Sequence, residues 1–130
     1  MVDPANGTTV GNFSASGIAV PDSTLSRVFF LGQTSKQVGT SDFTIQAFDQ
    51  SKFTLLDSIT ISNVVGSPTS LIRWGKNGLA FTSRTGAPTD FSNIGPGQLY
   101  LITGGFVSNS PSAAAKPRSA EHVRKTWSSR

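Results

Sequence analysis

Four side chains in this sequence combine a useful chemical type with a position beside a turn: Asp22, Asp49, Arg73 and Asn77. Loop-borne Asp and Asn, together with backbone carbonyls, supply the oxygen ligands that a hard cation such as Ca²⁺ takes. No contiguous calcium-binding loop is present. The alternative is turn formation, because Asp and Asn accept hydrogen bonds from nearby backbone N–H groups. The turn interpretation is favoured for each aspartate, and most clearly for Asp49, which precedes Gln-Ser-Lys-Phe.

Arg73 and Trp74 are neighbours in the segment Ser-Leu-Ile-Arg-Trp. An arginine beside a tryptophan can form a ligand-facing pair through a cation–π contact. The alternative is that Trp74 packs between neighbouring units of the fold while Arg73 pairs with an acid. The second interpretation is favoured.

Several other kinds of chemistry are excluded or disfavoured by residue type. The chain has no Cys, which excludes disulfides, zinc–thiolate sites and thiol catalysis. His122 is the only histidine, and no G-x-S-x-G segment precedes it, so a Ser-His-Asp triad is disfavoured. No phosphate-binding G-x-x-x-x-G-K-[ST] segment occurs.

The formal net charge of +4 comes from one end of the chain. Residues 1–111 carry six basic and six acidic side chains, whereas residues 112–130 carry five basic side chains and Glu121. The basic residues of this tail, with Trp127, could contact phosphates or acidic lipids, but the run is short and a solubilising tail is favoured. We therefore expect no nucleic-acid partner and no membrane partner, and no apolar run approaches the roughly 18–20 residues of a membrane span.

The elements that must position these residues are predicted to be short strands. Runs rich in Val, Ile and Phe alternate with turn residues up to residue 111, and we expect no helix there. The predicted strands are 10–13, 17–20, 27–32, 43–49, 53–62, 70–74, 79–83 and 98–103. In the tail, Ser119 as N-cap and Glu121 near the start favour a short helix.

The strands form a repeat. Three strands, with a turn and then a polar loop between them, occur twice, and each set follows another strand-like segment, at 8–16 and at 53–62. Ile18 maps onto Ile72 and Ile45 onto Leu99, both at an offset of 54 (72 − 18 and 99 − 45), and Phe30 maps onto Phe81. This predicts an all-β fold of two four-stranded antiparallel units of about 50 residues, near the period of propeller blades. A β-sandwich or barrel of eight short strands is the alternative.

The segments GIAVPDSTLSRVFFLG, AFDQSKFTLLDSI, LIRWGKNGLAF and GQLYLI resemble blades of bacterial β-propellers of the YncE-like and lactonase-like type. The resemblance covers about residues 8–107. It implies a two-blade domain over 1–111, followed by a basic tail over 112–130. Two blades cannot close a ring and leave apolar faces uncovered, so we expect a homo-oligomer of two to four copies. A compact fragment or swapped dimer, or a face covered by the tail, are the alternatives.

Two functions follow from the resemblance. The first is a non-catalytic scaffold that binds a ligand or partner and assembles through its open blade edges. The second is a lactone hydrolase, in which Ca²⁺ or another divalent cation would polarise the ester carbonyl. The resemblance would then make Asp22, Asp49 and Asn77 metal ligands and Arg73 an oxyanion partner, with acyl-homoserine lactones as one substrate class.

Overall fold

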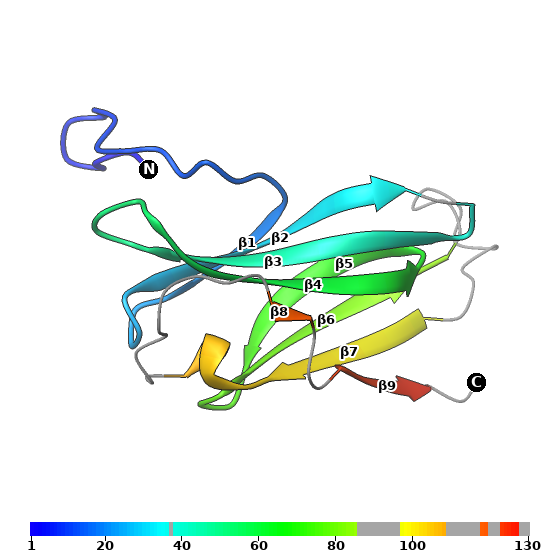
Figure 1. Cartoon of the computed structure of the whole chain (residues 1–130). Helices are drawn as coiled ribbons and strands as arrows, with labels where there is room; N and C mark the ends of the chain where they lie inside the picture. Colours follow the sequence, from blue (N-terminus) through cyan, green and yellow to red (C-terminus); the bar gives the residue numbers. More distant parts are fainter. Residues whose placement is uncertain (37, 86–96, 109–117, 120–122, 128–130) are drawn as a thin grey trace.

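The chain forms two β-sheets that lie one on the other (Figure 1). The computed structural model describes residues 1–36, 38–85, 97–108, 118–119 and 123–127. Within these residues the regular elements are strands and one short 3₁₀ helix, which confirms the all-β prediction. Neither sheet closes on itself.

The first sheet is an antiparallel meander of four strands, to which a short parallel strand is added. In sheet order they are β1 (Ile18–Asp22), β2 (Arg27–Lys36), β3 (Thr40–Asp49), β4 (Leu55–Val65) and β8 (Arg118–Ser119). The second sheet is antiparallel throughout. Its strands are β5 (Ser67–Trp74), β6 (Gly78–Arg84), β7 (Gly97–Thr103) and β9 (Val123–Trp127). The 3₁₀ helix η2 (Gly105–Val107) follows β7.

Seven of the predicted strands occur, but they are grouped differently from the prediction. Residues 53–62 were expected to lead the second unit; β4 instead pairs with β3 and completes the first sheet. A tight turn explains this, because Asp49 N–H donates to Thr54 O and Phe53 N–H to Asp49 O, which returns the chain directly onto β3. Residues 10–13 form no strand, and within 8–16 the only pairing is an isolated bridge from Val2 to Thr9.

The tail prediction is also wrong where it can be compared. Residues 118–119 and 123–127 lie in strands β8 and β9, not in a short helix. β9 pairs antiparallel with β7, so the backbone of this segment is hydrogen-bonded in a sheet and not in the expected helix. Glu121, His122 and the predicted boundary between residues 111 and 112 lie outside the described residues.

The hydrophobic core is one face of each sheet, pressed against the other. Because side chains alternate along a strand, every second residue of β2, β3, β6 and β7 points into this layer. The first sheet contributes Phe29, Leu31 and Ile45, all at most 2% exposed. In the second sheet, Phe81 and Tyr100 stack with ring centroids 4.5 Å apart.

The chain passes from the first sheet to the second at a single residue, Gly66. Its φ of +79° lies in the left-handed region, and a Cβ there would be 2.3 Å from Arg84 O. The neighbouring Val65 is held by the second sheet, because its N–H donates to Tyr100 Oη (3.3 Å) and its carbonyl accepts from Ser83 Oγ (2.7 Å). A residue without a side chain is therefore required at this crossing.

Replacing Gly66 tests this requirement. Gly39 is a matched control, because its φ is +81° and a Cβ there has no atom within 4 Å. We expect Gly39→Ala to lower the free energy of unfolding by about 1–2 kcal/mol, the cost of left-handed backbone. Gly66→Ala pays this cost and also a steric clash, so we expect a further loss of about 1–3 kcal/mol. Urea unfolding measures both, and equal losses would contradict the clash at the crossing.

Candidate functional site

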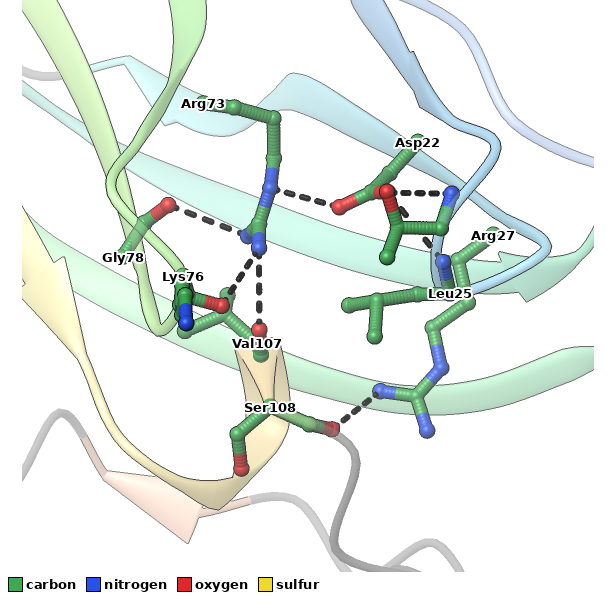
Figure 2. Close-up of polar contacts among 9 residues, drawn as sticks. Asp22, Leu25, Arg27, Arg73, Lys76, Gly78, Val107 and Ser108 are labelled. Carbon is green, nitrogen blue, oxygen red and sulfur yellow. Dashed lines mark hydrogen bonds and ion pairs between the residues drawn. The ribbon is translucent and has the colours of Figure 1, made fainter.

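A cleft of about 590 Å³ opens where the first turn of each sheet meets the other. Its walls are residues 21–25, from the β1–β2 turn, and Arg73 with residues 75–77, from the β5–β6 hairpin. This end of the molecule is opposite to the crossing at Gly66, because β1 and β5 both end here. Figure 2 shows the polar contacts around Arg73 and Asp22.

Asp22 serves two partners with its two carboxylate oxygens. Oδ1 accepts hydrogen bonds from the backbone N–H groups of Thr24 (2.9 Å) and Leu25 (3.1 Å), which closes the β1–β2 turn. Oδ2 lies 2.6 Å from Nε of Arg73. Asp22 is only 8% exposed, so a carboxylate is buried here because a charged partner and two backbone donors compensate it.

Arg73 ties three segments together through its guanidinium (Figure 2). Besides the ion pair with Asp22, it donates to the carbonyl oxygens of Gly78 (3.0 Å), Lys76 (2.8 Å) and Val107 (3.3 Å). The guanidinium carbon also lies 5.4 Å from the centroid of the Phe29 ring. The planar fork of an arginine suits this role because its donors point in fixed, divergent directions.

The helix η2 covers the core beside the cleft and is held there by two arginines. Val107 is fully buried, and its carbonyl is one of the acceptors of Arg73. Arg27, at the start of β2, donates from Nη1 to the carbonyl of Ser108 (3.1 Å). The position of η2 is therefore fixed by hydrogen bonds from both sheets.

Asp49 lies at the same end of the first sheet, as the last residue of β3, opposite Arg27 of β2 in the strand register, but it does not line the cleft. Its Oδ1 accepts from the hydroxyl of Ser51 (2.7 Å) and from the N–H groups of Ser51 and Lys52 (2.8 Å each). These bonds, the Ser51 hydroxyl foremost, lower the pKa of the Asp49 carboxyl below its usual value because they favour the charged form. The turn interpretation of Asp49 is confirmed.

The four residues singled out in the sequence thus divide into two places. Arg73, Asp22 and Asn77 share the cleft, and Asp49 does not. The expectation that Arg73 pairs with an acid is confirmed, whereas Trp74 is 50% exposed and does not pack between the two sheets.

A divalent cation has few free oxygen ligands here. Both oxygens of Asp22 and one oxygen of Asp49 already accept hydrogen bonds or an ion pair, and a guanidinium lies beside Asp22. Among the described residues no group of three or more His, Cys, Asp or Glu could hold a metal ion. This arrangement leaves few oxygen atoms for Ca²⁺ to bind, and the metal roles of Asp22, Asp49 and Asn77 stay a prediction.

The cleft also contains polar residues that were not selected from the sequence. They are Ser23, Thr24 and Lys76. The sequence does carry a signal for Lys76, because it lies in the segment Gly-Lys-Asn-Gly between the predicted strands 70–74 and 79–83, and this composition is typical of a tight turn. The sequence does not predict that this hairpin meets the β1–β2 turn.

Comparison with family models, with curated proteins and with solved structures finds no match to this chain. Among the described residues, no helix is long and apolar enough to cross a membrane. The site must therefore be interpreted from its own geometry.

The Asp22–Arg73 pair can be measured by a double-mutant cycle. Arg73→Met leaves a buried carboxylate without its charged partner, and we expect a loss of about 3–5 kcal/mol in unfolding free energy. Asp22→Asn keeps an oxygen for the turn, so the coupling of the two substitutions isolates the pair, with an expected value of about 1–3 kcal/mol. Chemical denaturation is the measurement, with Lys36→Met as an exposed control for loss of a charge. A coupling near zero would contradict the joining role of the pair.

The Ser51 hydroxyl can be tested as the main cause of the low pKa of Asp49. We expect Ser51→Ala to raise the pKa of the Asp49 carboxyl, measured by NMR titration of the side-chain carbon. A carboxyl whose folded pKa is depressed stabilises the fold above its unfolded pKa and loses this contribution as the pH falls through the folded pKa. The variant should therefore show a weaker loss of stability in acid, and an unchanged Asp49 pKa would contradict the assignment.

Proposed function

We propose that this chain is a non-catalytic binding scaffold made of two β-propeller-type blades, completed by further copies of itself. The first strands of the two sheets, β1 and β5, pack against each other, run in the same direction and are edge strands. Adjacent blades of a propeller place their innermost strands in this way around the central axis. The repeat of strand order and the offset of 54 between Ile18 and Ile72 support the same arrangement.

The cleft supports binding of a small polar ligand with a carboxylate or phosphate group. The charges of Asp22 and Arg73 compensate each other, which leaves Lys76 as the charged cleft residue without an ion pair among the described side chains. Asn77 and the hydroxyls of Ser23 and Thr24 add donors and acceptors that can orient a ligand. An apolar contact is available from Leu25, which packs against the core.

The single observation that carries the proposal is that the donors of the Arg73 guanidinium are already bonded within the protein. Its guanidinium makes four polar contacts inside the protein, and one of them, the ion pair with Asp22, joins the two sheets. An oxyanion partner must instead keep donors directed at the substrate. The residue thus supports a fixed scaffold better than a hydrolytic centre.

The lactone hydrolase remains the second candidate, because Asp22, Arg73 and Asn77 line one cleft. It requires a cation to displace the Arg73 guanidinium from Asp22, or Arg73 to release its carbonyl partners. The first step breaks the ion pair that joins the two sheets, and the second breaks contacts that hold the β5–β6 hairpin and η2. Binding and hydrolysis therefore make different demands on the same residues.

One experiment separates the two functions. We expect the ring-opened acid N-butanoyl-homoserine to shift the amide NMR signals of residues 23–25 and 75–77. Lys76→Met should weaken this binding at least about threefold, because it removes the cleft ammonium. Lys36→Met, which removes an equal charge outside the cleft, should leave it unchanged.

The corresponding lactone serves as the hydrolysis probe, with Ca²⁺ added and with EDTA. We expect no turnover in either case. Turnover that EDTA and Asp22→Ala both abolish would overturn the scaffold proposal and support the hydrolase. Absence of any shift at 23–25 and 75–77 would reject the cleft as the binding site.

A further inference from the structure

The second sheet has a second apolar face, directed away from the first sheet. Its members alternate with the core residues along β5, β6 and β7, and cross-strand pairing aligns Ile72, Ala80 and Leu101 in one row. This face is open along the edge strand β5, where Ile72 is 53% exposed and Trp74 is 50% exposed, whereas Ala80 on β6 is only 2% exposed. Large exposed apolar residues that share one sheet face commonly mark an interaction surface.

The internal repeat shows what kind of surface fits this face. Ile72 corresponds to Ile18 at the offset of 54, and Ile18 packs against the core between the two sheets. Leu99 corresponds to Ile45, which is fully buried in that core. In the repeat, the outer face of the second sheet therefore corresponds to the inner face of the first sheet, which packs against the second sheet.

The complementary surface is the outer face of the first sheet. Phe30 corresponds to Phe81 in the repeat, and Phe81 lies on the second-sheet face that contacts the first sheet. Phe30 itself points away from the core, because it alternates with Phe29 and Leu31 on β2. The outer face of the first sheet, which carries Phe30, therefore corresponds in the repeat to the second-sheet face that packs against the first sheet.

This outer face of the first sheet is aromatic. The rings of Phe13, Phe30, Phe48 and Phe53 contact one another with centroids 5.0–5.6 Å apart. Phe48 is buried by this packing, whereas Phe13 and Phe30 are half-buried, and Ala19, the neighbour of Phe30 across the β1–β2 ladder, is exposed. The cluster thus presents an apolar surface beside an exposed small residue.

We infer that a second copy of this chain docks head to tail, its Phe13–Phe30 face on the Ile72–Trp74 face of the first. The inference rests on the two-blade architecture of the proposed function and names the partner and both surfaces. Such a contact is heterologous, since each copy uses two different faces, and it forms rings when the rotation between copies closes. Rings of four to eight blades would contain about two to four copies.

The test uses one lysine on each face. Ile72→Lys blocks the second-sheet face and Ala19→Lys blocks the first-sheet face, and both positions are exposed, so the fold tolerates the change. We expect the wild-type chain to sediment as two to four copies, and each variant alone as a 13.7 kDa monomer. Val38→Lys, at a fully exposed valine between β2 and β3, is the matched control and should assemble like the wild type.

Mixing the two variants identifies the head-to-tail arrangement. Each has one intact face, and the two intact faces are complementary, so an equimolar mixture should form a 1:1 dimer that grows no further. Loss of assembly in Ile72→Lys but not in Ala19→Lys would overturn the inference in favour of a symmetric contact between second sheets. A monomeric wild type, or assembly unchanged in both variants, would also overturn it.

Two further measurements keep the outcomes distinct. Circular dichroism checks that each variant is folded, and Trp74→Glu with Phe13→Glu provides an independent pair on the same two faces. Binding of N-butanoyl-homoserine at the cleft is recorded for the monomeric variants. Assembly without cleft binding would reject ligand binding in the proposed function and leave the head-to-tail contact standing. Cleft binding by a monomeric wild type would reject the head-to-tail contact and the completion by further copies, and leave ligand binding standing.

Discussion

The number of sheet faces is the constraint on which this structure depends. Two sheets have four faces, and both sheets are apolar on both sides over part of their area, yet only two faces can bury each other within one chain. The first sheet exposes less apolar surface on its outer side, because Phe13 from the N-terminal segment and Phe53 from the β3–β4 turn pack with Phe30 and Phe48. Phe53 adopts a φ of +58° to do so, a conformation that a bulky residue takes only when packing compensates it.

The two sheets are joined by different means at their two ends. At one end the covalent crossing at Gly66 fixes their separation, and the hydroxyls of Tyr100 and Ser83 satisfy the backbone of Val65. At the other end no peptide bond joins β1–β2 to β5–β6, and the Asp22–Arg73 pair takes that role. Because the cleft lies between these same turns, its width depends on the pair. The ligand binding proposed for the cleft and the stability of the contact between the sheets therefore depend on one set of contacts.

Much of the strand pattern could be predicted, since β-branched and aromatic runs separated by turn residues determine it locally. Turn formation by Asp49 was also predictable, because its partners Ser51 and Lys52 are adjacent in sequence. The grouping of β4 was not, because a run of alternating residues does not say which neighbour it will pair with, and only the tight turn at Phe53 decides it. The joining of Asp22 to Arg73 spans 51 positions (73 − 22), and no local rule links residues so far apart.

The repeat explains why similar residues have different exposures in the two sheets. Ile18 and Ile72 are equivalent by position and identical by type, yet one packs against the core and the other is half exposed. The difference comes from the count of units, since Ile18 has a sheet to face and Ile72 has none within the described residues. A stable single unit would be expected to carry a polar residue at such a position, as terminal repeats generally do. An isoleucine followed two residues later by a tryptophan on an uncovered face is instead typical of an internal unit, and this composition supports the proposed packing of a second copy beside the second sheet.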